Sequence, residues 1–294
     1  MKRCWAAQVE VLESFDRICR ENGLTYYLAY GTLMGAVRHG GYIPWDDDLD
    51  VCMLRPEAKK LAALSPDVFV REGLELATPS NDPTLRNLAF RLINTRETKL
   101  EENFLQKYHL FPFMAGLDIF PLDYIPKRRD KWETQRTVFA SASLLAKLAA
   151  DPESDPQELM SAYKEVAKLL GVKPVREVSQ VEAHLWALTE RAAAMYGPRD
   201  TDRVANIAMY HNTGRQLFPV EWFGQPEYLT FEGLTVPVPA QTDAVLKEIY
   251  GPDYMTPIQS PSVHSYPWYR PWHEQLIRFF DANGIPCPSI YREL

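Results

Sequence analysis

The sequence of 294 residues has few cysteines, no long apolar run and no excess of basic residues. Its cysteines, Cys4, Cys19, Cys52 and Cys287, are scattered without a CxxC pair, which argues against a disulfide framework and a zinc site. No stretch reaches the roughly 18 consecutive apolar residues of a transmembrane helix. The net charge of −7 argues against a general nucleic-acid-binding protein, which usually presents a basic face.

The N-terminal stretch "MKRCWAAQVEVLESFDR" also lacks the apolar core of a signal peptide, because Glu10, Glu13 and Asp16 follow the first basic residues closely. Together with reduced thiols, this predicts a cytoplasmic location. The overall composition, 46% hydrophobic and 24% charged, is that of an ordinary globular protein.

Residue patterns predict a mixed α/β unit over residues 1–126. Apolar residues at helical spacing predict an amphipathic helix over about 5–21, which Asn22-Gly23 ends. A second helix, "GTLMGAVRH", is expected directly after the first strand, and Gly40-Gly41 ends it. The predicted strands are "LTYYLAY" (24–30), "DLDVCML" (48–54), "LRNLAFRLINT" (85–95) and "MAGLDIFPLDYI" (114–125), the last stopped by Pro121.

The chain then changes character twice. Residues 127–200 are rich in Ala, Leu, Lys and Glu and predict three helices separated by "DPESDP" and "GVKPVRE". Residues 201–294 are rich in Pro and aromatic residues and predict short strands followed by a helix near 241–250. We therefore divide the chain into 1–126, 127–200 and 201–294.

The chemistry of the chain is concentrated in "WDDDLDV", which holds Asp46, Asp47, Asp48 and Asp50. In a strand, residues two apart share a face, so Asp46, Asp48 and Asp50 are expected on one side, with Asp48 and Asp50 most firmly inside the strand. Such carboxylates, about 7 Å apart, suit a hard divalent ion, and Mg²⁺ usually binds one or two carboxylates plus substrate phosphates. A solvated acidic loop is the alternative, but these acids run into an apolar strand.

A phosphate-binding turn is predicted just upstream, at Gly31-Thr32. This pair follows a strand and opens a helix, where free backbone N–H groups and the helix dipole attract anions. Arg38 and His39, near the other end of the helix, are candidates for a distal phosphate. An N-cap or a packing glycine is the alternative for the turn.

The string "YGTLMGAVRHGGYIPWDDDLDV" resembles the signature of the LicD/fukutin-related family, in the nucleotidyltransferase-like superfamily. That signature reads much like G-T-L-L-G-A-x-R-H-x-G-x-I-P-W-D-D-D-x-D. The matching positions are Gly31, Thr32, Leu33, Gly35, Ala36, Arg38, His39, Gly41, Ile43, Pro44, Trp45, Asp46, Asp48 and Asp50. "LDIFPLD", and "FEGLTVPVP" with "IYGPDYM", resemble later family blocks, whereas residues 130–197 carry no family motif.

The resemblance implies a nucleotidyltransferase-like catalytic core over 1–126, a helical insertion over 127–200, and a C-terminal part that completes the core and contributes to the donor or acceptor site. It implies an enzyme that transfers phosphocholine, or a similar phosphoalcohol, from CDP-choline or a related CDP-alcohol to a cell-surface glycan or its precursor, such as lipopolysaccharide or teichoic acid. Peripheral association with membrane-linked glycan precursors is compatible with it, and nucleic acid is not an expected partner.

The resemblance also assigns residues. It carries the catalytic, metal-binding carboxylates over to Asp48 and Asp50, with Mg²⁺ as the expected ion and Mn²⁺ as an alternative. The superfamily uses a third carboxylate, for which Asp118 fits because it lies among apolar neighbours in mid-strand; an edge-strand or turn residue is the alternative. Asp123 fits less well, since it follows Pro121 and is expected in a loop.

Two further assignments stay open at the level of sequence. Arg91 stands in an apolar strand, where a structural ion pair is the default and a phosphate contact the alternative. A choline head group favours an aromatic cage through cation–π contacts. The sequence does not choose among the candidates Trp45, Tyr210, Trp222, Tyr228, Trp268 and Trp272.

Two other functions are compatible with the same residues. A true nucleotidyltransferase, moving a nucleoside monophosphate to a sugar or another small acceptor, would share every active-site residue and release pyrophosphate instead of CMP. A non-enzymatic divalent-cation-binding module would use the acids alone, although the chain has no EF-hand loop.

Overall fold

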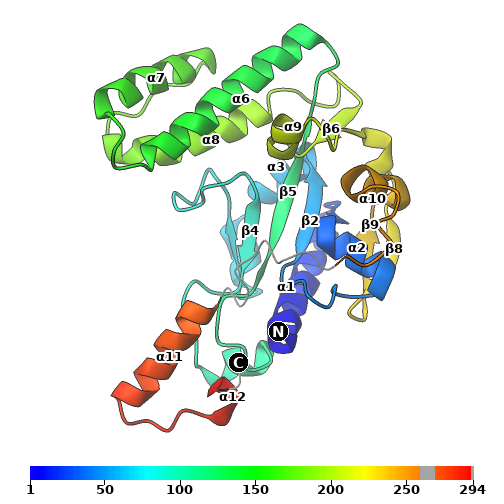
Figure 1. Ribbon diagram of the computed structural model, residues 1–294, viewed down its shortest axis with the longest axis vertical. Coiled ribbons are helices and arrows are strands. Elements are labelled where there is room, and N and C mark those ends of the chain that lie inside the picture. Colours follow the sequence, from blue (N-terminus) through cyan, green and yellow to red (C-terminus); the bar gives the residue numbers. More distant parts are fainter. Residues whose placement is uncertain (259–268, 293–294) are drawn as a thin grey trace.

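A computed structural model describes residues 1–258 and 269–292, and Figure 1 shows a central mixed sheet with helices around it. The strand order is β1-β2-β5-β4-β3, with β6 pairing with β5 and β7 with β6. Strands β2 and β5 are parallel, and the other neighbours are antiparallel. The strands of this sheet are β1 (Tyr27–Leu28), β2 (Asp50–Leu54), β3 (Glu75–Ala77), β4 (Phe90–Ile93), β5 (Gly116–Tyr124), β6 (Arg203–Ala205) and β7 (Phe218–Pro219). The predicted α/β class with a mixed sheet is confirmed.

Helices and a separate hairpin surround this sheet. The hairpin consists of β8 (Glu227–Phe231) and β9 (Leu234–Val238), beside which α2 and α10 lie at the right of Figure 1. The α-helices are α1 (Lys2–Glu21), α2 (Tyr30–His39), α3 (Arg55–Ala62), α4 (Pro66–Val70), α5 (Glu102–Lys107), α6 (Arg129–Ala149), α7 (Pro156–Leu169), α8 (Val181–Ala193), α9 (Ile207–Thr213), α10 (Thr242–Tyr250), α11 (Arg270–Ala282) and α12 (Ser289–Arg292). Short 3₁₀ turns lie at Val178–Gln180 and Val220–Phe223.

The first two helices form where the residue pattern predicts them. Helix α1 buries Leu12, Phe15 and Ile18, which lie on one helical face, in the main core. Helix α2 ends at Gly40, whose φ of 68° is left-handed and therefore suits glycine. The predicted helix near 241–250 is confirmed as α10.

Strand lengths differ from the prediction. The stretch 24–30 contributes only β1, because Tyr30 has a positive φ of 45° and already begins helix α2. Strand β2 begins at Asp50 rather than Asp48, because its pairing with β5 begins where Asp50 lies opposite Asp118. The Asp118 N–H donates to the carbonyl of Leu49, the residue just before the strand. The short elements β3, α4 and α5 and the later helices α9, α11 and α12 have no counterpart in the prediction.

The prediction that Pro121 ends its strand is wrong, because β5 continues to Tyr124. The Asp118 N–H points toward β2, so the nitrogen of Pro121, three positions later, faces the opposite side. On that side β4 has already ended, with Phe90 opposite Ile119. No neighbouring strand needs the N–H that proline lacks, so the strand tolerates it.

Asp123 consequently lies in β5 and not in a loop. Its carboxylate binds Arg55, with Nε 2.6 Å from Oδ1, and the same guanidinium contacts Glu190 of α8 at 3.0 Å. All three side chains are largely buried, so this ion network joins the sheet to helix α8. Asp123 therefore has a structural partner that accounts for its burial.

The three helices predicted between 127 and 200 are confirmed as α6, α7 and α8, at the top of Figure 1. They enclose a small apolar core of their own, which includes Ala142, Tyr163 and Leu185. The main core combines α1 and the sheet with later residues such as Val236 and Leu246. The division at residues 126 and 200 stays a prediction.

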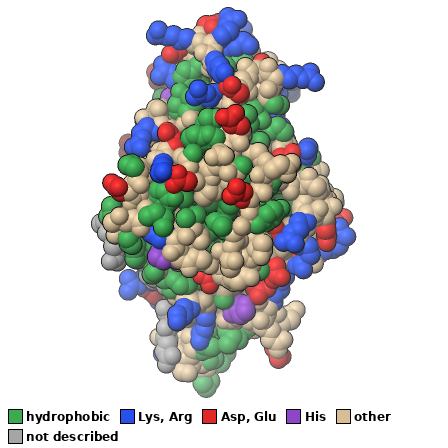
Figure 2. All heavy atoms as spheres, turned by 90° about the vertical axis from the view of Figure 1, so that its right-hand side faces the viewer, with side chains coloured by type: hydrophobic (Ala, Val, Ile, Leu, Met, Phe, Trp, Pro, Cys, Tyr) green, Lys and Arg blue, Asp and Glu red, His purple; other side chains and the backbone are tan. Residues whose placement is uncertain are grey.

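Figure 2 shows the face formed by α2, α10 and the hairpin β8–β9, with hydrophobic side chains over much of its middle. Lys and Arg side chains gather at the top and along the edges of this face. No helix in the described ranges combines the length and apolar composition needed to cross a bilayer. The four cysteines are unpaired, as predicted.

Candidate active site

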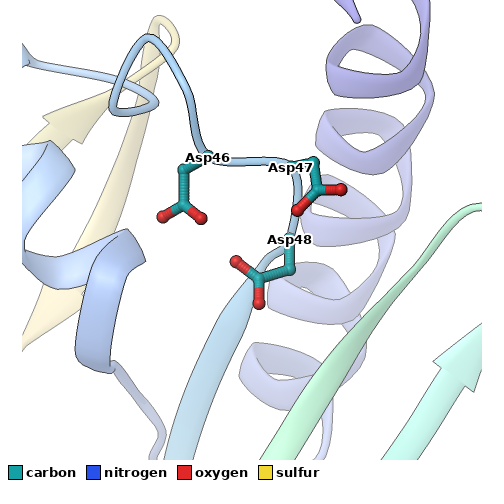
Figure 3. Close-up of side chains that lie close together, drawn as sticks. All are labelled: Asp46, Asp47 and Asp48. Carbon is teal, nitrogen blue, oxygen red and sulfur yellow. The ribbon is translucent and has the colours of Figure 1, made fainter. Parts of the chain in front are cut away.

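The centre of the site is a short acidic loop, residues 46–48, between α2 and β2. One carboxylate oxygen from each of Asp46, Asp47 and Asp48 lies within 4.8 Å of the other two. Figure 3 shows the carboxylates of Asp46 and Asp48 turned toward a common space, whereas Asp47 projects toward helix α1. Asp47 is only 3% exposed, in agreement with its position against this helix. The loop therefore concentrates negative charge in one place.

Helix α1 holds this loop in position. The Trp5 indole N–H donates to the Asp46 carbonyl at 2.9 Å, and the Gln8 amide donates to the Asp47 carbonyl at 3.0 Å. Trp5 also stacks on Tyr42, with ring centroids 4.8 Å apart. These contacts fix the backbone of the loop and therefore set the direction in which its carboxylates project.

Strands β2 and β5 add two more acids. Asp50 opens β2 and is in register with Asp118 on the parallel strand β5, so the two side chains share one face of the sheet. The Asp50 N–H donates to the Thr32 hydroxyl oxygen at 2.8 Å, which ties the start of β2 to helix α2. Thr32, predicted to bind phosphate, is buried and acts here as a support for Asp50.

Arg91 lies opposite Asp118 on β4 and binds it. Its Nε and Nη2 nitrogens donate to the two carboxylate oxygens at 2.8 and 3.3 Å. Both side chains remain about a third exposed, so this pair lies at an accessible part of the site. Of the two roles weighed for Arg91, the structure shows the ion pair.

The electrostatics of the site centre on Asp50. Its burial raises its pKa well above the usual range, and the charges of Asp48, Asp118 and Asp46 raise it further, in that order. These four carboxylates are therefore close enough to repel one another. Such a group is costly when ionised unless a cation compensates the charge.

Two tyrosines near the acids were not singled out by the sequence. Burial raises the pKa of the Tyr250 hydroxyl, and so do Asp50, Asp46 and Asp48, whereas Arg38 lowers it. Tyr30 accepts a hydrogen bond from the Asn206 amide at 3.1 Å, and burial raises its pKa, with a smaller contribution from Asp50. Both hydroxyls therefore lie within the field of the acidic group.

Gly31 has a specific spatial role in the second position of α2. A Cβ atom there would overlap the Asp46 carboxylate. The first hydrogen bond of the helix runs from the Leu33 N–H to the Ala29 carbonyl, so the helix itself does not use the Gly31 and Thr32 N–H groups. The glycine thus lets an acidic side chain lie directly against the start of the helix. Gly35, in contrast, packs against the Gly41 carbonyl.

Arg38 and His39 lie at the other end of α2. Arg38 donates from Nη1 to the Tyr254 carbonyl at 3.1 Å and from Nε to the His39 ring at 3.0 Å. The effect of Arg38 on the pKa of Tyr250 shows that its charge reaches the acidic side of the site. Arg38 is thus a cation that can face a bound anion.

The aromatic candidates for a choline cage come from separate elements. Tyr210 of α9 packs on Trp132, and Trp222 packs on Phe218. Tyr228 is exposed on β8, whereas Trp45 lies beside the acidic loop and Trp272 on α11. Trp268 lies outside the described residues.

The donor set fits a hard divalent cation. All available ligand atoms are carboxylate oxygens, which is the chemistry that Mg²⁺ and Mn²⁺ prefer. The raised pKa of Asp50 shows that the charges present do not compensate one another. The sequence singled out Asp48, Asp50 and Asp118, whose role as metal ligands stays a prediction. It did not single out Asp47, which belongs to the acidic cluster, or the supports Trp5 and Gln8, which lie about 40 residues away along the chain.

Comparison with known proteins finds similarity in the part of the chain that carries these acids. The family model "LicD/FKTN/FKRP, nucleotidyltransferase domain" matches residues 23–133, which include all the acids described above. The chain is similar to the lipopolysaccharide cholinephosphotransferase LicD of Haemophilus influenzae, with 42% identity over 67 residues, or 23% of this chain and 24% of that protein. It is also similar to an uncharacterised protein of Rickettsia prowazekii, with 35% identity over 57 residues, or 19% of this chain and 21% of that one.

These alignments span about a quarter or less of the length of each relative. The family match over residues 23–133 includes the strand, the helix and the acidic loop that build the site. Residues 23–133 of the chain are therefore similar to the nucleotidyltransferase domain of the LicD/FKTN/FKRP family.

Proposed function

We propose that this protein is a metal-dependent transferase that moves phosphocholine, or a similar phosphoalcohol, from a CDP-alcohol to a cell-surface glycan or its precursor. The observation that carries this is the group formed by Asp46, Asp48, Asp50 and Asp118 within the matched family domain. The similarity to a lipopolysaccharide cholinephosphotransferase supports the choice of phosphocholine and glycan.

Asp48, Asp50 and Asp118 are the proposed ligands of Mg²⁺ or Mn²⁺. A divalent ion bound there would neutralise charge on the diphosphate of the donor and on the departing CMP. Asp118 is suited to a fixed ligand position, because Arg91 orients both of its oxygens. Trp5 and Gln8 keep the acidic loop rigid, so little reorganisation is needed when the donor binds.

The donor phosphates would lie between these acids and helix α2. Arg38, with His39 beside it, is the proposed cationic contact for the phosphate oxygens, and the Gly31 and Thr32 N–H groups are proposed as additional donors. In the reaction, the glycan hydroxyl oxygen bonds to the choline-bearing phosphorus. The bond from that phosphorus to the bridging oxygen breaks, CMP leaves with the electron pair, and the hydroxyl proton passes to a carboxylate of the acidic loop.

We place this reaction in the cytoplasm, which the four unpaired cysteines support. The proposed partners are thus a soluble CDP-alcohol and a glycan acceptor, including one carried at a membrane surface.

The test is to incubate the protein with Mg²⁺ and a panel of CDP-choline, CDP-ethanolamine, CDP-glycerol and CTP, with a glycan extract as acceptor. Release of CMP from one CDP-alcohol, absent in Asp48→Asn, is the expected result. The exposed Glu165→Gln serves as a control that removes an acid outside the site. Pyrophosphate release from CTP with no CMP from any CDP-alcohol would instead show nucleotidyl transfer and contradict the proposal.

A further inference from the structure

A large cavity lies between helix α3 and the helices α7 and α8, away from Asp48, Asp50 and Asp118. Its volume is about 850 Å³, and Phe90 of β4 forms part of its wall. In a strand, neighbouring residues point to opposite faces, and Arg91, the next residue, binds Asp118. The cavity therefore lies on the other face of the sheet from Asp50 and Asp118. Its size is in the range of small-molecule sites.

Much of the cavity wall is apolar. Leu170 and Val172 close it from the end of α7, and Leu188 and Met195 line it from α8 and the residues that follow. Leu169, also in the wall, is 68% exposed, so part of this apolar wall faces solvent. An apolar wall of this kind gains free energy when hydrocarbon replaces water.

The same cavity carries two cations. Lys59 of α3 and Arg191 of α8 line it, both are exposed, and neither has an ion pair with any residue in the ranges 1–258 and 269–292. The acid Glu190 also lines the cavity, but its carboxylate is already bound by Arg55. Lys59 acts electrostatically on the carboxylates of Asp123 and Glu190, but Arg55 binds both of them. In a chain with a net charge of −7, the cavity thus offers two exposed cations without an ion-pair partner among the described acids.

His184 adds a hydrogen-bond donor. The fully buried Tyr163 hydroxyl accepts from the Val175 N–H at 2.6 Å and lies 2.5 Å from the His184 Nδ1. Burial lowers the pKa of His184, so the ring is neutral at pH 7. The buried hydroxyl proton needs an acceptor, which only Nδ1 supplies among the described contacts. Nε2 therefore carries the ring proton, and His184 lines the cavity as a donor.

We propose that this cavity binds a single-chain anionic amphiphile, with a hydrocarbon tail against the apolar wall and a phosphate head between Lys59, Arg191 and His184. Charge complementarity selects the anion, and a volume of about 850 Å³ suits one small-molecule ligand rather than a bilayer surface. This site is separate from the acids, so it does not depend on the transferase activity.

Dodecyl phosphate is the probe, titrated calorimetrically into the whole protein below its micelle concentration. We expect saturable one-to-one binding, with much weaker binding of inorganic phosphate, which lacks the tail, and of dodecyl maltoside, which lacks the charge. Equal binding of dodecyl maltoside would overturn the proposal, because the cations would then contribute nothing. Sedimentation with vesicles of phosphatidylcholine and phosphatidic acid tests whether the protein binds phosphate head groups on a membrane surface rather than a single-chain phosphate in the cavity. Retention on these vesicles without binding of dodecyl phosphate would identify a membrane surface instead and reject the single-chain ligand.

Two variants locate the binding in the cavity. Lys59→Gln with Arg191→Gln removes both exposed cations and should weaken dodecyl phosphate binding by about tenfold or more, since hydrogen bonds to charged groups are strong. The control, Lys164→Gln with Arg176→Gln, removes two exposed cations of the same helical segment outside the cavity and should bind normally. Ala187→Phe fills the cavity and should abolish binding; if it fails to fold, the charge variants still decide. Equal affinity in the two double variants would overturn the proposal.

Discussion

Asp50 and Asp118 occupy matching positions on the parallel strands β2 and β5, yet only Asp118 is bound by an arginine. Asp50 is 9% exposed and has Asp46, Asp48 and Asp118 as charged neighbours. The negative charge of Asp118 is therefore compensated by Arg91, whereas the charged neighbours of Asp50 are other acids. A site with this imbalance is suited to capture a cation from solution.

Neutralising Asp50 should separate stability from activity. Its raised pKa means that the ionised form is disfavoured in the folded chain, so Asp50→Asn removes an unfavourable charge at pH 7. In EDTA we expect a higher melting temperature, by about 2–4 °C for each kcal/mol gained, while CMP release falls by about a hundredfold or more. Thermal melts and rate measurements check this, and Glu165→Gln should change neither. A variant with normal turnover would remove Asp50 from the site.

The two glycines of α2 should respond in opposite ways to alanine. Within a helix, Gly→Ala gains about 1 kcal/mol of stability. Gly31→Ala should keep or raise the melting temperature but displace the Asp46 side chain, which occupies the space of the new methyl group, and so weaken divalent-ion binding. Gly35→Ala should lower the melting temperature, because its methyl group meets the fixed Gly41 carbonyl. Unchanged metal affinity in a stable Gly31→Ala would show that the position of Asp46 is irrelevant to the site.

CDP-choline, or the CDP-alcohol that proves to be the donor, should raise the melting temperature only when Mg²⁺ is present. A ligand that binds the folded state alone stabilises it by mass action, and here the diphosphate would otherwise face several carboxylates. Thermal scans with Mg²⁺ or EDTA, each with and without nucleotide, measure the effect. An equal rise in EDTA would show that the diphosphate is bound elsewhere.

His184 should make stability depend on pH. Burial lowers its folded pKa below the unfolded value of about 6.5, so the unfolded chain binds more protons in that range. The stability from the neutral His184 is thus fully present above pH 6.5 and is lost as the pH falls through the folded pKa. Urea unfolding between pH 5 and 8 should show a shallower slope for His184→Gln than for the wild type. His211, whose pKa is also lowered, contributes to both curves and cancels in the comparison. Identical slopes would contradict the neutral, Tyr163-bound state of His184.

The elements with regular local patterns were predictable from the sequence. Helices α1, α2, α6, α7, α8 and α10 follow from apolar spacing and from glycine or proline at their ends. Asp118, expected in the middle of a strand, lies in β5 and is in register with Asp50 of β2. The helices depend on residues that lie close together along the chain, and the choice of Asp50 and Asp118 depends on the family resemblance.

The rest depends on contacts between distant residues. The acidic loop is not part of β2, because its backbone carbonyls are bound by side chains of helix α1 and not by a neighbouring strand. Trp5 binds the Asp46 carbonyl, 41 residues further along the chain, and Gln8 binds the Asp47 carbonyl, 39 residues further along. Strand β5 runs through Pro121 because β4 has ended, which no local pattern reveals. In the sequence, Trp5 and Gln8 are ordinary residues of an amphipathic helix, and no pattern indicates that they bind the acidic loop.

The decisive measurement is Mn²⁺ binding, followed by electron paramagnetic resonance in the wild type, Asp48→Asn and Glu165→Gln, with and without CDP-choline. We expect the wild type and Glu165→Gln to bind Mn²⁺ more tightly in the presence of CDP-choline, because the carboxylates and the diphosphate bind the ion together. Asp48→Asn should lose at least about tenfold in Mn²⁺ affinity. Equal Mn²⁺ affinity in all three proteins, unaffected by CDP-choline, would contradict a metal-dependent transferase site at these acids.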